Sequence, residues 1–297
     1  MKNLKIKNYN RSVLEHATLI TRGSCFFDTY DLNNGYIFKK LKDDDDLDFL
    51  EILEYDTFIK DILIKLQLSQ EIDCESIIKP DSIYMLKDFF IGYTVAKVDG
   101  VSLDDTLSES SDLDFISSLI IKLSEEVRKA NKEGVNFPDL GNASNVMIER
   151  GTGKIKFIDY DGLQVFDQPS YSISNLISPS TNPYFDSAKY RSKKTGIVES
   201  NLDKASLYAL FLYYSTKTLM SRFKHGDYVV SGRKISIKDE AIDRYCSEIG
   251  VIDTSMQEDI HTIYSPRTNN YPDTSIKRLV RDYRLEKKGD TNTFIKK

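Results

Sequence analysis

Three oxygen-bearing side chains surround one predicted hairpin, and their types suit the chemistry of magnesium and phosphate. Asn145 begins an apolar run, a turn at residues 149–153 follows, and Asp159 comes directly after a second apolar run at residues 155–158. This pattern predicts two paired strands with Asn145 and Asp159 at the same end. Asp139 lies just upstream. Mg²⁺ takes few protein oxygens and keeps other positions for water and phosphate, so the trio predicts a phosphoryl-transfer site in which one carboxylate accepts a proton.

A purely conformational role is the alternative for this segment, because Asp and Asn are the commonest turn residues. Other kinds of site are disfavoured by the rest of the sequence. The cysteines are odd in number and far apart, which argues against a disulfide framework and a zinc site; they are Cys25, Cys74 and Cys246. The histidines are equally isolated, so a His-based triad or a His-ligated metal is not expected; they are His16, His225 and His261.

Length and composition indicate a folded protein with room for two lobes, each with its own core. The chain has 297 residues, of which 40% are hydrophobic and 29% charged. Its net charge of -5 gives no indication of nucleic-acid binding. No apolar run approaches the roughly 18 residues of a membrane-spanning helix, and the N-terminal residues lack the apolar core of a signal peptide. We therefore expect a cytoplasmic protein with no membrane partner, although delivery into another cell stays open and the oligomeric state is not indicated.

The first third of the chain predicts a mostly antiparallel, five-stranded sheet with one helix. The strands are expected at residues 17–21, 26–32, 36–41, 77–86 and 89–96, and the helix at 47–66. Residues 99–102 then mark a break. Beyond it the apolar period becomes helical, which predicts a helix at 113–127 closed by Gly134 and a second one at 202–220. Residues 167–201 have no clear periodicity.

This order of elements, with the polar trio on the hairpin, resembles the protein kinase superfamily in its eukaryotic-like branch, with a degenerate glycine loop. The resemblance covers residues 17–220. It implies a bilobal α+β fold, with an N-lobe at residues 1–98 and a mainly helical C-lobe at 99–297. It also implies ATP and Mg²⁺ as cofactors and a protein as the substrate.

The resemblance also assigns roles to individual residues. Tyr36-Ile37-Phe38-Lys39 is similar to the family's Val-Ala-Ile-Lys strand, so Lys39 would bind the phosphates. Glu54 would hold that lysine in place, with Glu51 as the alternative. Asp139 would be the catalytic residue, and the metal ligands would be Asn145 and Asp159. The residues expected to bind the nucleotide are Gly23, Ser24, Ile37, Lys39, Ala96, Lys97, Val98 and Met147.

Two segments of the second half match the family further. Asp203 and the residues after it are similar to a helix of kinase C-lobes whose buried Asp accepts hydrogen bonds from the backbone of the catalytic loop. Residues 184–190 are similar to the end of an activation segment. The first of these matches favours a protein kinase over small-molecule kinases, which share only the catalytic trio.

Several departures from the family pattern keep other functions open. Cys25 and Asp28 occupy later glycine positions, and Asp28 would repel phosphates if it pointed inward. The spacing from Asp139 to Asn145 is one residue longer than in the family, and Asp161 replaces a glycine. We expect a kinase of protein Ser or Thr hydroxyls. The alternatives are a pseudokinase that binds nucleotide or protein without turnover, and a kinase of small molecules.

Overall fold

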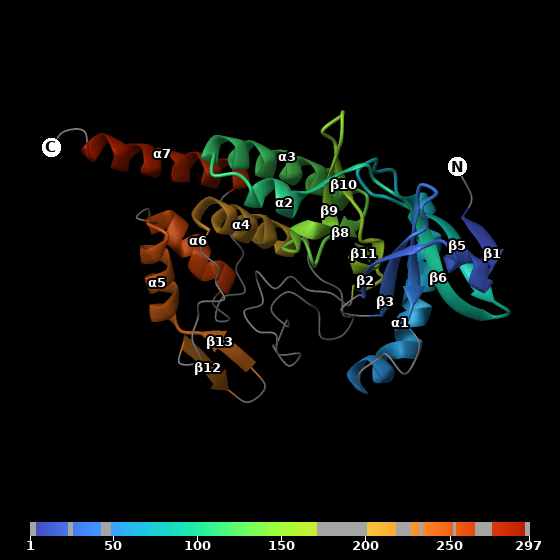
Figure 1. Ribbon diagram of the computed structural model, residues 1–297. Coiled ribbons are helices and arrows are strands. Elements are labelled where there is room, and N and C mark those ends of the chain that lie inside the picture. The colour runs from blue at the N-terminus through green and yellow to red at the C-terminus, as the bar shows by residue number, and fades with distance from the viewer. Residues whose placement is uncertain are drawn as a thin grey trace.

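The computed structural model describes residues 4–22, 26–42, 49–170, 201–217, 227–231, 234–251, 254–264 and 275–294. An antiparallel-rich sheet with one long helix lies at one end of the molecule, and a mainly helical part lies at the other (Figure 1). This arrangement confirms the predicted α+β class. Among the described residues, no helix is both long enough and apolar enough to cross a membrane.

The large sheet has six strands in the order β1-β5-β6-β4-β3-β2. The strands are β1 (Lys5–Asn8), β2 (Thr18–Arg22), β3 (Phe27–Asp31), β4 (Tyr36–Leu41), β5 (Pro80–Leu86) and β6 (Phe89–Ala96). The five predicted strands are present, but the predicted number of strands was too low. β1 was missed because it is only four residues long and contains one apolar residue, the exposed Ile6, which is too short a pattern to indicate a strand. It pairs in parallel with β5 at the edge of the sheet.

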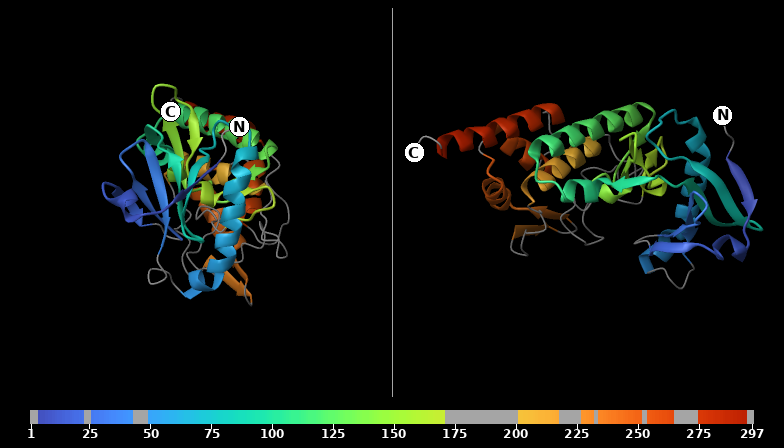
Figure 2. Two further views of the ribbon diagram at one scale, coloured as in Figure 1. Left: turned by 90° about the vertical axis from the view of Figure 1, so that its right-hand side faces the viewer. Right: turned by 45° about the horizontal axis from the view of Figure 1, so that its top comes forward.

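One helix, α1 (Phe49–Leu68), packs beside the sheet (Figures 1 and 2). Its side chains are described from residue 57 onward. Phe58, Ile62 and Leu66 recur at intervals of four residues and are all buried, which gives the helix an apolar face. The ring of Phe58 stacks on that of Phe26 with 3.9 Å between centroids. Burial of each such side chain stabilises the fold by about 1.5–3 kcal/mol.

The chain leaves the large sheet after Ala96 and enters a second, three-stranded sheet at Gly100. The strand order there is β10-β9-β7, with β7 (Gly100–Ser102), β9 (Val146–Glu149) and β10 (Ile155–Phe157). A Cβ atom on Gly100 would overlap the carbonyl oxygen of Ile148. Glycine is therefore required where the connecting strand approaches the hairpin.

The rest of the described chain is mainly helical. The helices are α2 (Leu103–Ser108), α3 (Leu113–Lys132), α4 (Asn201–Thr216), α5 (Asp239–Glu248), α6 (Thr254–Tyr264) and α7 (Ile276–Phe294). Short elements complete it: η1 (Arg11–Leu14), η3 (Ser69–Glu71), β8 (Val135–Asn136), η4 (Ala143–Asn145), η5 (Tyr160–Gly162), β11 (Gln164–Val165), β12 (Tyr228–Ser231) and β13 (Lys234–Ile237).

Two predicted helix ends can be compared with the structure. Gly134 follows α3 with a φ of +77°, a left-handed conformation in which glycine is favoured and which agrees with the predicted closure. The helix predicted at 202–220 instead ends at Thr216. Lys217 has a φ of +53°, and its N–H donates to the carbonyl of Tyr213. This left-handed residue ends the helix earlier than the apolar pattern indicates.

Candidate active site

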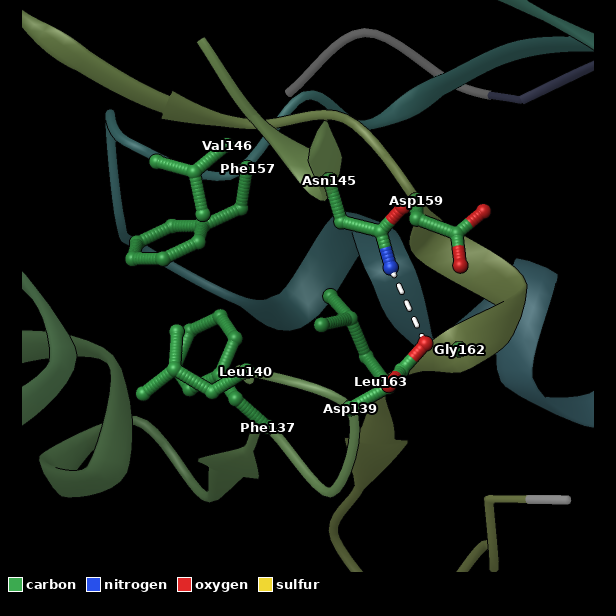
Figure 3. A pocket seen from close by; sticks show the side chains of 9 residues that line it. All are labelled: Phe137, Asp139, Leu140, Asn145, Val146, Phe157, Asp159, Gly162 and Leu163. Atoms are coloured by element: carbon green, nitrogen blue, oxygen red, sulfur yellow. Dashed lines mark hydrogen bonds between the residues drawn. The ribbon is translucent and has the colours of Figure 1, made fainter. Parts of the chain in front are cut away.

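The β9–β10 hairpin brings Asn145 and Asp159 to one end of the same strand pair. Val146 lies opposite Phe157 in the antiparallel register, and the N–H of Ile158 donates to the carbonyl of Asn145 at 3.0 Å. The amide nitrogen of Asn145 donates to Oδ2 of Asp139 at 3.2 Å. Asp139, Asn145 and Asp159 line one small cavity (Figure 3). The trio that the sequence singled out is therefore brought together.

The loop from Asp139 to Asn145 accommodates its extra residue with two consecutive turns. The N–H of Asn142 donates to the carbonyl of Asp139, and the N–H of Asn145 donates to the carbonyl of Asn142, both at 3.0 Å. The second turn forms η4. The longer spacing therefore leaves Asn145 beside Asp139 instead of displacing it.

Asp203 fixes the start of this loop, as the sequence predicted. It is 1% exposed and lies on α4. Its Oδ1 accepts a hydrogen bond from the N–H of Phe137 at 2.9 Å, and its Oδ2 accepts one from the Asn131 amide at 2.7 Å. Phe137 also packs against Phe157, with 4.2 Å between ring centroids. These contacts hold the loop against the hairpin.

Lys39 reaches the trio from β4. It is buried, and its ammonium group forms ion pairs with Asp159 and, at 2.5 Å, with Oδ1 of Asp161. Lys39 lies opposite Thr29 and Tyr93 in the sheet, whereas Lys40 lies opposite Asp28 and Gly92. Because neighbouring residues of a strand face opposite sides, Lys39 and not Lys40 points to the site.

Sequence reasoning gave no role in the site to three residues that surround Lys39, namely Asp161, Tyr93 and Lys65. The hydroxyl of Tyr93 donates to Oδ1 of Asp161 at 2.6 Å. Lys65 of α1 is 1% exposed, and its ammonium group donates to the carbonyls of Asp161 and Leu163 at 2.9 and 2.8 Å. The repeated aspartate of Asp159-Tyr160-Asp161 was a signal that could have identified Asp161. Tyr93 and Lys65 carry no local signal, because they lie far from Asp161 in the sequence.

The charges of the site influence one another strongly. Burial and the nearby Asp159 raise the pKa of Asp139 to about 7, against hydrogen bonds from Asn142 and Asn145 that favour the ionised form. Burial and repulsion from Asp161 also raise the pKa of Asp159, although Lys39 opposes this. Burial alone would raise the pKa of Asp161, but Lys39 and the Tyr93 hydroxyl outweigh it and lower that pKa.

The same balance keeps Lys39 charged. Burial would lower its pKa, but the charges of Asp159 and Asp161 outweigh burial and raise it. The site therefore contains a cationic Lys39 and an anionic Asp161 as a stable pair. Asp139 is placed to exchange a proton near neutral pH.

Several residues predicted to bind nucleotide do not line this cavity. Ala96 is exposed and lies opposite Tyr36, on the other face of the sheet from Lys39. Lys97 is also exposed and pairs with Asp31 at 2.5 Å. Val98 is half-buried, and Met147 lies opposite Ser102 and Lys156 in the three-stranded sheet. Ile37 lies opposite Val95 on the same face as Lys39.

The remaining predicted residues fall outside the described parts. Gly23 and Ser24 are not described, nor are the side chains of Glu51 and Glu54. Residues 184–190 are also outside the described ranges. Asp28 is described: it lies opposite Lys40, so its side chain is on the face of the sheet away from Lys39. It therefore does not point toward phosphates held by Lys39.

The donor set of the site fits Mg²⁺. In Figure 3 the amide nitrogen of Asn145 points to Asp139, and its amide oxygen lies on the side of Asp159. Within the described ranges, no group of three or more His, Cys, Asp or Glu side chains could hold a metal ion. One amide oxygen and one carboxylate match Mg²⁺, which is commonly held by few protein ligands together with water and substrate phosphates.

Comparisons with known proteins find similarity among solved structures. No protein-family model matches the chain, and no curated protein matches it. Among solved structures, the chain is similar to the kinase PK-1 of the Cydia pomonella granulovirus, with 12% sequence identity and a TM-score of 0.48. The similarity covers 91% of this chain and 95% of the viral kinase.

Proposed function

We propose that this chain is an ATP- and Mg²⁺-dependent phosphotransferase that phosphorylates Ser or Thr hydroxyls of a protein. The observation that carries the proposal is the meeting of Asp139, Asn145, Asp159 and Lys39 in one site. Lys39 comes from a sheet strand, Asp139 from a loop, and Asn145 and Asp159 from the entrance and exit of one hairpin, at the same end of its two strands. They supply a buried cation, two oxygen ligands and a carboxylate that can accept a proton, which are the kinds of group that phosphoryl transfer uses.

Each of these residues has a distinct task in the proposed reaction. Asn145 and Asp159 would hold Mg²⁺, which when bound neutralises the charge of the phosphate oxygens. The ammonium group of Lys39 orients the phosphates by charge. Asp139 accepts a hydrogen bond from the acceptor hydroxyl and takes up its proton on a carboxylate oxygen as the new oxygen–phosphorus bond forms. The bond between the γ-phosphorus and the bridging oxygen of ATP breaks in the same step, and ADP leaves with that oxygen. Catalysis then depends on positioning and electrostatic stabilisation.

The second candidate function is a module that binds nucleotide or protein without turnover. The observation that favours it is the direct ion pair between Asp159 and Lys39. In that state the predicted metal ligand and the predicted phosphate ligand neutralise each other. A protein kept in this state would need no catalytic step.

Two measurements test the proposal. Thermal unfolding with ATP, with and without Mg²⁺, reports whether the site binds the metal–nucleotide complex. Intact-protein mass spectrometry after incubation with ATP, Mg²⁺ and a mixture of acceptor proteins reports transfer. The wild type should gain or transfer phosphate, Asp139→Ala should lose at least about 100-fold of that rate, and Asp88→Ala, at an exposed turn, should match the wild type.

The outcomes separate the candidate functions. Equal transfer by the wild type and Asp139→Ala contradicts catalysis at this site. Stabilisation by ATP and Mg²⁺ without transfer selects the binding module. Phosphate found only on added aminoglycosides or choline selects a small-molecule kinase, and phosphotyrosine in the products contradicts the Ser or Thr assignment.

A further inference from the structure

Asp161 is held in the candidate site by side chains from three elements. Its Oδ1 accepts hydrogen bonds from Lys39 at 2.5 Å and from the Tyr93 hydroxyl at 2.6 Å. Its backbone carbonyl accepts a third from Lys65 at 2.9 Å. The donors come from β4, β6 and α1, so three elements of the N-terminal part fix one residue of the turn η5.

Asp159 is the other carboxylate partner of Lys39. Its Oδ1 contacts Lys39, while its Oδ2 lies against Gly162. It lines the cavity with Asp139 and Asn145, whereas Asp161 does not. Asp159 is thus the partner of Lys39 that is placed to bind a cation in the cavity. The carboxylate of Asp161 contacts Lys39 and Tyr93 and does not line that cavity.

A cation bound by Asp159 would weaken that residue's hold on Lys39, because one carboxylate cannot fully compensate two positive charges. Lys39 is buried, and a buried ammonium group without an anionic partner is costly. A lysine on a flexible stem also needs a fixed partner to stay in one position. Asp161 satisfies both needs, because its carboxylate also accepts a hydrogen bond from Tyr93 and its backbone carbonyl accepts one from Lys65.

We infer that Asp161 is a positioning residue that holds the Lys39 ammonium group in place for the phosphates while Asp159 is engaged with the cation. This inference rests on the proposed function. In it, Asp161 contacts neither the cation nor the phosphates and acts through Lys39. It supplies the anchoring carboxylate that the sequence assigns to Glu54, and the carboxylate comes from the hairpin side of the site instead of α1.

A double-mutant cycle with Lys39→Ala tests this role, because residues that act through one another give non-additive effects. We expect Asp161→Asn to lower kcat/KM for ATP by about 10–100-fold, since small misplacements of a reacting group cost that much. In the Lys39→Ala background the same change should have no further effect on kcat/KM. ATP affinity in the presence of Mg²⁺, measured over the same four proteins, should show the same non-additivity.

Two other substitutions serve as matched comparisons. Glu54→Gln tests the rival anchor, and its effect should add to that of Lys39→Ala if Asp161 is the anchor. Asp259→Asn repeats the chemical change at another buried aspartate that accepts a hydrogen bond from a tyrosine, Tyr208, on a helix away from the site. It should lower the melting temperature without changing the effect of Lys39→Ala.

Tyr93→Phe covers the case in which Asp161→Asn does not fold. It keeps the buried ring and removes only the hydroxyl that holds Asp161, and its effect on kcat/KM should likewise vanish in the Lys39→Ala background. Additive effects of Asp161→Asn or Tyr93→Phe with Lys39→Ala overturn this inference and leave the proposed function standing. A wild type that binds no nucleotide overturns both.

Discussion

Gly162 lies directly against the carboxylate of Asp159. A Cβ atom on Gly162 would overlap Oδ2 of Asp159, so the absence of a side chain at position 162 creates the space that this carboxylate occupies. The hydroxyl of Ser170 also donates to the carbonyl of Gly162 at 2.8 Å. This hydrogen bond helps to hold the turn that carries Asp159 and Asp161. The lack of a side chain at Gly162 leaves room for the carboxylate of Asp159, the predicted metal ligand.

Gly162→Ala is therefore expected to displace the Asp159 carboxylate with little loss of stability. We expect kcat/KM for ATP to fall by about 10–100-fold, because the predicted metal ligand moves. Steady-state kinetics and a thermal unfolding curve check this. Gly151→Ala is the control: φ at Gly151 is +79° with open space around it, so alanine should cost stability, roughly 1 kcal/mol, and leave activity unchanged. Full activity in Gly162→Ala would contradict the proposed place of Asp159.

Because the pKa of Asp139 is raised in the folded protein, its ionisation at higher pH should lower the free energy of unfolding. Its pKa is about 7 in the fold, against a usual value of 3.8. The folded protein therefore keeps a proton that the unfolded chain has released. This contribution to stability is complete below about pH 4 and is lost as the pH rises through 7.

Asp139→Asn cannot ionise, so its stability relative to the wild type should increase between pH 5 and pH 8. We expect a gain on the order of 1–2 kcal/mol at pH 8, because the side chain is partly exposed and its charge is partly screened. Urea unfolding without metal or nucleotide measures the difference. Asp88→Asn, at an exposed position, should show no such trend. A relative gain that shrinks with increasing pH would contradict the raised pKa.

The parts that could be predicted from the sequence are those fixed by local patterns. The hairpin that carries Asn145 and Asp159 follows from two apolar runs around a turn, and the turn between β3 and β4 follows from Asn34-Gly35. The edge strand β1 gave only a weak signal, because it is four residues long and contains one apolar residue, Ile6. Its pairing with β5 depends on tertiary structure alone.

The site shows the same division between local and distant contacts. Tyr93 and Lys65 meet Asp161 across 68 and 96 residues of sequence, so no local spacing could reveal them. Asp161 was interpreted only as a lost glycine, because comparison with a family pattern records a substitution and not the contacts it creates. The structure shows that the new side chain pairs with Lys39.

Two substitutions of Asp203 should weaken the hold on the loop from Asp139 to Asn145 to different degrees. Asp203→Ala leaves the N–H of Phe137 and the amide of Asn131 without their acceptor, which we expect to cost about 2–4 kcal/mol. Asp203→Asn keeps one oxygen for the N–H of Phe137 and should cost less. Urea unfolding gives the two values, and phosphate transfer should fall in the same order. Equal stability of Asp203→Ala and the wild type would show that the bond from Phe137 does not hold the loop.

The variant Asn145→Asp tests whether the cavity binds a metal ion. We expect it to lower the melting temperature without Mg²⁺ and to be stabilised by Mg²⁺ more readily than the wild type. A third carboxylate beside Asp139 and Asp159 adds repulsion, so the melting temperature of the metal-free protein should fall. Mg²⁺ should reverse that loss at lower concentrations than affect the wild type, since an added carboxylate strengthens binding of a hard cation. Asn142→Asp is the matched control, because Asn142 also lies beside Asp139 but does not line the cavity. Its melting temperature should fall without recovery in Mg²⁺, whereas equal recovery of both variants would place the cation elsewhere.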